Sequence, residues 1–129
     1  MLFKKRKQTS AQSLKLGELG EQLARQHLKR LGLTVIERNF RSRYGEIDLI
    51  AIDGNVLVFC EVKSRRAGSG KPFDSLHNRK QQQVRRMAAE WLSKKKGNDF
   101  KPNLRFDAIG ITIDSYGKLV SLEHLEDAF

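Results

Sequence analysis

The stretch that most constrains the fold runs from Gly45 to Ser64 and reads GEIDLIAIDGNVLVFCEVKS. Two apolar runs flank an Asp-Gly pair, which is a strong signal for a two-residue β-hairpin turn. Buried strands carry few charges, yet Asp48, Glu61 and Lys63 lie within these runs. The hairpin therefore predicts a central sheet and a site built on it.

The register of this hairpin decides whether the three charges meet. With residues 53–54 as the turn, Asp48 lies opposite Phe59, and Glu61 is its diagonal neighbour. Side chains alternate between the two faces of a strand, so we expect Asp48, Glu61 and Lys63 to point the same way. A slip of one residue would put the two carboxylates on opposite faces.

Two carboxylates placed this close repel each other. At ~5 Å and an effective dielectric constant of ~20, the repulsion costs about 3 kcal/mol. A divalent cation bound by both would relieve it, and Mg²⁺ is suited because it takes oxygen ligands and keeps bound waters. The simpler alternative is an ion pair between Lys63 and one carboxylate at the strand end.

The motif itself resembles that of a known superfamily. Asp48, followed by Glu61-Val62-Lys63 on the next strand, is similar to the motif of the PD-(D/E)xK nucleases, which include restriction endonucleases and archaeal Holliday junction resolvases. The run Glu46-Ile47-Asp48 stands in place of a literal Pro-Asp and keeps the acid. More specifically, the chain resembles the YraN-like family, UPF0102, through the segments GELGEQLA, RNFRSRYGEIDLIA, VFCEVKSR, RFDAIGI and SLEHLEDAF.

The resemblance implies both a fold and an activity. The fold is α/β and restriction-endonuclease-like, with a central mixed β-sheet flanked by helices. The activity is that of a metal-dependent endonuclease, which hydrolyses phosphodiester bonds in nucleic acid. DNA is the favoured substrate, including branched DNA in repair or recombination. The cofactor is Mg²⁺ or Mn²⁺, held by Asp48 and Glu61, with Lys63 orienting a water or offsetting phosphate charge.

A third acid comes from the first predicted helix. Leucine spacing predicts this helix over residues 14–31. On a helical wheel Glu21 falls at the edge of the apolar stripe, whereas Glu18 falls on the polar side. In the resembling nucleases a glutamate of the first helix contributes to the metal site, so the resemblance gives this role to Glu21. A solvent-facing helix charge is the alternative.

The charge balance predicts a polyanionic partner. Lys and Arg number 25 against 15 Asp and Glu, a net charge of +10, and such an excess most often serves nucleic-acid binding. The alternatives are a basic protein without such a partner, and a nucleic-acid-binding module that does not cleave. Candidate contacts to phosphates or bases are Arg38, Arg41, Arg43, Tyr44, Arg65, Arg66, Lys71, Lys80 and Gln82.

Length and composition limit the number of domains, the association with membranes and the compartment. Residues 1–13 predict a flexible basic arm, and residues 14–129 a single domain with a second helix over 76–96. No signal-peptide core and no run of the ~20 apolar residues of a transmembrane helix is present, so we expect no membrane partner. The single Cys60 fits a reducing cytoplasm. The sequence leaves open whether the protein forms a homodimer. Asp107, in an apolar strand, is expected to be paired inside the fold, and the three histidines show no metal-ligand spacing.

Overall fold

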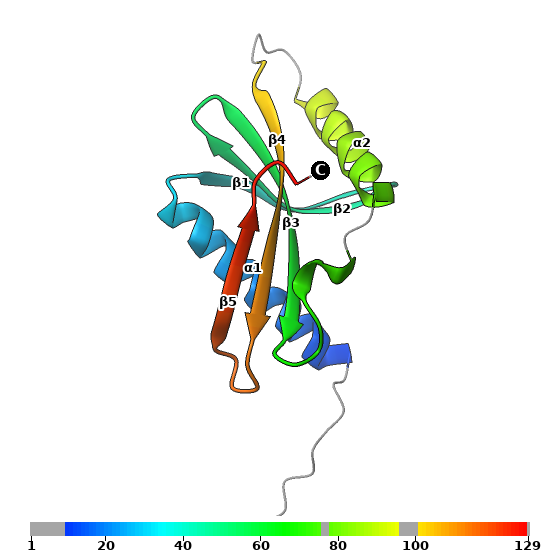
Figure 1. Ribbon diagram of the computed structural model, residues 1–129. Coiled ribbons are helices and arrows are strands. Elements are labelled where there is room, and N and C mark those ends of the chain that lie inside the picture. The colour runs from blue at the N-terminus through cyan, green and yellow to red at the C-terminus, as the bar shows by residue number, and fades with distance from the viewer. Residues whose placement is uncertain (1–9, 76–77, 96–100, 129) are drawn as a thin grey trace, which may run out of the picture.

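The computed structural model describes residues 10–75, 78–95 and 101–128. Their five strands form one sheet in the order β1-β2-β3-β4-β5 (Figure 1). The elements are α1 (Ser10–Arg30), β1 (Thr34–Ser42), β2 (Gly45–Asp53), β3 (Val56–Arg66), the 3₁₀ helix η1 (Pro72–Ser75), α2 (Asn78–Lys94), β4 (Asn103–Ile113) and β5 (Leu119–Leu125). Only β3 and β4 pair in parallel, so the sheet is mixed. The expected α/β, restriction-endonuclease-like architecture is confirmed.

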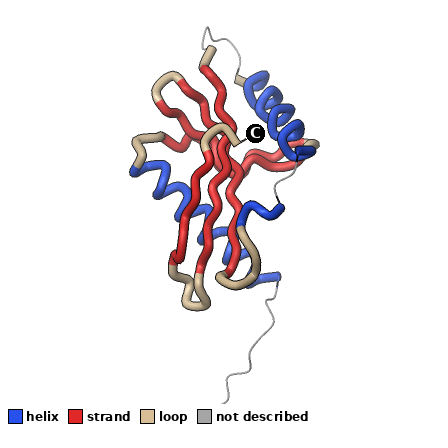
Figure 2. The backbone as a smooth tube through the Cα atoms, viewed as in Figure 1, coloured by secondary structure: helices blue, strands red, loops and turns tan. Residues whose placement is uncertain are grey.

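Each helix covers its own face of the sheet (Figure 2). Ala24 and Leu28 of α1, one helical turn apart, are fully buried against one face. The stripe on α2 that includes Val84, Met87 and Trp91 is buried against the other face. No described helix is long and apolar enough to cross a membrane.

Strand β3 lies inside the sheet and is buried on both faces. Val58 and Cys60 point into the core under α1, whereas Leu57 and Phe59 point into the core under α2. The parallel pairing of β3 with β4 requires a long connection between them, and η1 and α2 provide it. Strand β3 is thus paired on both edges and packed on both faces, and it carries the Glu-Val-Lys run near its end.

The turn between β2 and β3 differs from the one expected. Asp53 pairs with Val56, so Gly54 and Asn55 form the turn, and the register is shifted by two residues from the prediction. Gly54 has a φ of 58°, and a Gly-Asn pair is also a competent hairpin turn. Asp53 stays in the ladder, where its carboxylate lies 3.8 Å from the guanidinium of Arg105. A shift of two residues keeps the side chains of the paired residues 49–53 and 56–60 on their expected faces.

The first helix also differs at its start. It begins at Ser10, four residues earlier than predicted and within the segment expected to be an arm. The remaining arm, residues 1–9, lies outside the described part of the chain.

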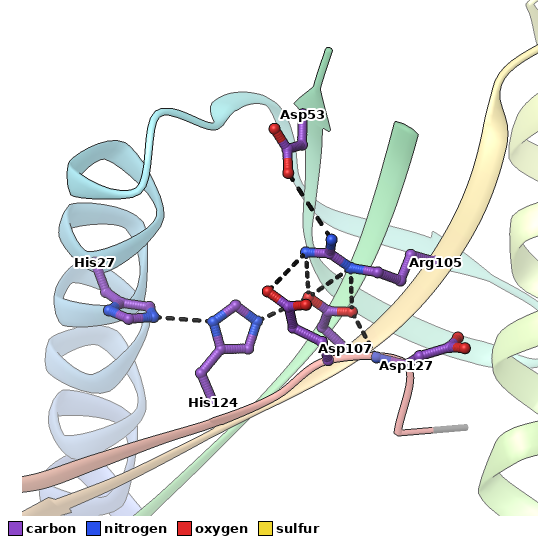
Figure 3. A network of polar contacts seen from close by, with 7 residues as sticks. His27, Asp53, Arg105, Asp107, His124 and Asp127 are labelled. Atoms are coloured by element: carbon purple, nitrogen blue, oxygen red, sulfur yellow. Dashed lines mark hydrogen bonds and ion pairs between the residues drawn. The ribbon is translucent and has the colours of Figure 1, made fainter. Parts of the chain in front are cut away.

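A buried polar network joins α1 to the far edge of the sheet (Figure 3). Asp107 is fully buried and accepts hydrogen bonds from Arg105 Nη2 at 2.9 Å, from the Asp127 backbone N–H at 3.0 Å and from His124 Nε2 at 2.7 Å. His124 Nδ1 is then left to accept a hydrogen bond from His27 Nε2 at 2.9 Å. The predicted pairing of Asp107 is confirmed, and two histidines without a predicted role prove to tie helix to sheet.

Candidate active site

Asp48 lies where strand β2 separates from β3. The ladder between these strands ends at the pair Leu49 and Cys60, and the two strands diverge beyond it (Figure 1). Ile47 belongs to the core under α2, but Leu49 belongs to the core under α1, so regular alternation fails at Asp48. The backbone N–H of Val62 donates to Asp48 Oδ2 at 2.7 Å. The carboxylate thus takes the place of a missing backbone partner, close to the plane of the sheet.

The surroundings of Asp48 favour its neutral form. Burial is the largest cause and raises its pKa to about 7, against the opposing hydrogen bond from Val62. The negative charges of Glu61, Glu46 and Glu21 are smaller contributions to this same rise. Three carboxylates from α1, β2 and β3 are therefore close enough to act on Asp48, and a cation beside Asp48 would lower its pKa.

A cavity of about 920 Å³ opens beside Asp48 on the α1 side of the sheet. Its charged lining combines Glu18, Glu21, Glu46 and Asp48 with Arg41, Arg65 and Arg66, and Asn39, Ser64, Ser69, Leu16, Gly17 and Val62 complete it. Helix α1 approaches β3 closely here, because a Cβ on Gly20 would overlap Ser64 Oγ. This approach places Glu21, the next residue, at the cavity, as the resemblance implied.

The expectation that Glu61 and Lys63 point the same way as Asp48 is wrong, because side-chain alternation along β2 fails at Asp48. Along β3 they alternate with Val62 and Ser64, which line the cavity, so they project toward the α2 side. Glu61 is only 6% exposed, and its Oε1 lies 3.1 Å from Lys63 Nζ. The ion pair left open as the alternative is thus present. It does not isolate Glu61, whose charge still acts on Asp48.

The family of the chain follows from comparison with known proteins. The model of "Uncharacterised protein family UPF0102" matches residues 20–111. The chain belongs to the UPF0102 family. This match spans Asp48, the three acids whose charges act on it, and Lys63, but ends before β5.

UPF0102 relatives are similar over almost the whole chain. A UPF0102 protein of Rhodococcus opacus is 44% identical over 120 residues, covering 92% of this chain and 99% of the relative. One from Geobacter sulfurreducens is 47% identical over 115 residues, covering 88% of each chain. One from Clostridium kluyveri is 41% identical over 115 residues, covering 88% of this chain and 93% of the relative.

The carboxylates around Asp48 in this UPF0102 chain suit a hard cation, but they are not yet arranged as a complete metal site. Carboxylate oxygens are the ligands that Mg²⁺ prefers. Within the described residues, no three His, Cys, Asp or Glu side chains already form a metal cage. A cation would have to draw Asp48 and its neighbours together. The metal roles of Asp48, Glu61 and Glu21 stay predictions.

The predicted nucleic-acid contacts divide into three groups. Arg41, Arg65 and Arg66 line the cavity, where Arg41 lies 3.6 Å from Glu46. Tyr44 lies on the α2 side, with the guanidinium carbons of Arg43 and Arg86 at 5.1 and 5.7 Å from its ring centroid. The other candidates are the exposed Arg38, Lys71 and Gln82, and Lys80, whose side chain lies outside the described part.

Sequence reasoning left five polar residues of the cavity out of the predicted site: Glu18, which it had placed on the polar side of the first helix, and Asn39, Glu46, Ser64 and Ser69. Glu46 lies two residues before Asp48, so regular alternation would put both on one face, as the cavity lining has them. Asn39 lies within strand β1 with a φ of 53°. An asparagine inside a strand pattern is the signal that points to such a position, because asparagine tolerates this backbone conformation better than most residues.

Proposed function

We propose that this UPF0102 protein is a Mg²⁺- or Mn²⁺-dependent endonuclease, which hydrolyses phosphodiester bonds in nucleic acid, with DNA favoured. The observation that carries the proposal is Asp48, a partly buried carboxylate with a pKa of about 7, surrounded by the charges of three other carboxylates. A cation would stabilise the charged form of such a group, and the cavity beside it is also lined by three arginines suited to phosphates.

In this proposal different residues bind the metal, bind the phosphate and assist the attacking water. Asp48, Glu61 and Glu21 would hold the cation, which when bound supplies an acidified water and positive charge near the phosphate. Arg41, Arg65 and Arg66 bind phosphate oxygens at the rim of the cavity. Lys63, paired with Glu61 on the α2 side, would orient the attacking water or offset the charge that develops on the phosphate once the cation draws these side chains toward Asp48.

The second candidate is a nucleic-acid-binding module that does not cleave. One observation favours it: Glu61 is engaged by Lys63 at 3.1 Å, which already neutralises part of the acidic cluster. The two candidates agree on the basic surface and differ only in chemistry. A cytoplasmic location, which the lone buried Cys60 suggests, is compatible with both candidate functions. So does a homodimer, which would suit branched DNA with two equivalent strands.

A cleavage assay separates the two candidates. The purified protein is incubated with linear and branched DNAs and RNAs, with Mg²⁺, with Mn²⁺, or with a chelator. The enzyme proposal expects metal-dependent strand cleavage of at least one substrate, and none with the chelator. Binding with a normal salt dependence but without cleavage of any substrate in either metal would favour the binding module instead.

A further inference from the structure

Asn39 adopts a costly backbone conformation inside a regular strand. Its φ of 53° lies in the left-handed region, although its neighbours Arg38 and Phe40 keep their pairs on β2. Holding a non-glycine residue there costs about 1–2 kcal/mol, and asparagine is among the residues that tolerate it best. The surrounding structure must therefore hold Asn39 in place.

The side chain of Asn39 contacts one of the candidate metal ligands. Its Nδ2 donates to Glu21 Oε1 at 3.3 Å, and Arg25 Nη1 donates to the same oxygen at 3.4 Å. Neither contact uses Oε2. The Glu21 carboxylate is thus held through one oxygen by its own helix and by strand β1.

This contact lies at the cavity beside Asp48. Asn39, Glu21 and Asp48 all line it, and the charge of Glu21 is among those that Asp48 feels. Residues that orient a metal ligand are typically worth 10–100-fold in metal affinity or activity. Such residues act without touching the metal or the substrate.

We propose that Asn39 is a positioning residue: its strained backbone aims the amide at Glu21 and fixes that carboxylate beside Asp48 for a divalent cation. The role rests on the proposed function. The rival explanation is that β1 only needs to bend at this point. A glycine would then serve equally well, because glycine adopts positive φ at no steric cost.

The substitution Asn39→Gly separates these explanations, since it keeps the bend and removes the amide. We expect the free energy of unfolding to stay within about 1 kcal/mol of the wild type, whereas calorimetry should show Mn²⁺ affinity about tenfold weaker. We expect kcat to fall with KM for nucleic acid unchanged, because a neutral amide adds little to the attraction of phosphates. Ser69→Ala is the matched control: Ser69 lines the same cavity, but its hydroxyl donates to the Arg66 carbonyl, and Mn²⁺ affinity should not change.

A double-mutant cycle tests whether Asn39 acts through Glu21. In a Glu21→Ala background, Asn39→Gly should weaken Mn²⁺ binding no further. Wild-type Mn²⁺ affinity in Asn39→Gly, an equal loss in both backgrounds, or loss of folding in Asn39→Gly would each overturn the positioning role alone. A wild-type protein that binds no Mn²⁺ would remove the proposed function and this role together.

Discussion

Asp48 combines burial, a backbone hydrogen bond and three acidic neighbours. Its predicted place on the hairpin depended on regular alternation, which fails there because Ile47 and Leu49 enter different cores. Residue identity alone indicated the acid and its neighbour Glu61. The Val62 N–H bonds to the Asp48 carboxylate in place of a backbone carbonyl because β2 leaves β3 at this point. The residue pattern of a single strand does not show where two strands separate.

Replacing Asp48 should stabilise the metal-free protein at neutral pH. A carboxyl group whose pKa is raised in the folded state, here to about 7 from 3.8, favours folding when protonated and opposes it when charged. We expect Asp48→Asn to raise the free energy of unfolding by up to about 4 kcal/mol at pH 8. The gain should shrink as pH falls through 7 toward 4, because the wild-type carboxyl becomes neutral. Urea unfolding at several pH values measures it, and a gain independent of pH would contradict the assignment.

The His27–His124 contact should respond to pH in the opposite direction. Burial, His124 and Arg30 lower the pKa of His27 below 6.5, so the unfolded chain binds more protons than the folded one as pH falls through that value. Stability from this contact is present above pH 6.5 and declines below it. The difference in unfolding free energy between the wild type and His27→Gln should therefore shift in favour of the variant from pH 7.5 to 5.5. A constant difference would show that the contact does not titrate.

At the scale of elements, the sequence predicted whether a segment is a helix or a strand better than it predicted the register in which strands pair. The two apolar runs of the hairpin and the stripe on α2 were recognisable because their periods of 2 and 3.6 follow from backbone geometry. The turn was misplaced because Asp53-Gly54 and Gly54-Asn55 are both competent, and the contact of Asp53 with Arg105 on the distant strand β4 favours the second. The only sign in the sequence that α1 approaches β3 closely was the pair Gly17 and Gly20. Of the two, only Gly20 lies at the contact with β3.

Those two glycines of α1 provide a matched pair of substitutions. A Cβ on Gly20 would overlap Ser64 Oγ and lie 2.9 Å from Ser64 Cβ, whereas a Cβ on Gly17 would meet nothing within 4 Å. We expect Gly20→Ala to lower the free energy of unfolding by about 1–3 kcal/mol. Gly17→Ala should raise it by up to about 1 kcal/mol through helix propensity. Denaturant titration of both variants checks this, and equal effects would show that α1 does not depend on close contact with Ser64.

At the scale of the whole molecule, the net charge of +10 predicts affinity that depends strongly on salt. With about five phosphate contacts, log K should fall against log salt with a slope near −4 to −5 on duplex DNA. Composition gave this expectation without a structure. The structure adds that part of the charge, Arg41, Arg65 and Arg66, lines the same cavity as Asp48.

Substitution of Lys63 separates binding from chemistry. Lys63→Ala removes one charge, so the salt slope should change by no more than about one unit. Cleavage should fall by about two orders of magnitude if Lys63 acts in the transition state. Binding isotherms at several salt concentrations and single-turnover cleavage, measured on one substrate, give both quantities. A loss of cleavage only in proportion to lost binding would make Lys63 an ordinary phosphate contact.

The most direct test of the central claim compares two isosteric substitutions on the same strand. Asp48→Asn and Asp53→Asn each remove one negative charge from β2, but only Asp48 lines the cavity. With substrate saturating and Mg²⁺ fixed, the single-turnover cleavage rate of Asp48→Asn should fall by at least about 100-fold. That of Asp53→Asn should stay within about twofold of the wild type. Equal rates in the two variants, or a wild-type rate in Asp48→Asn, would contradict the account.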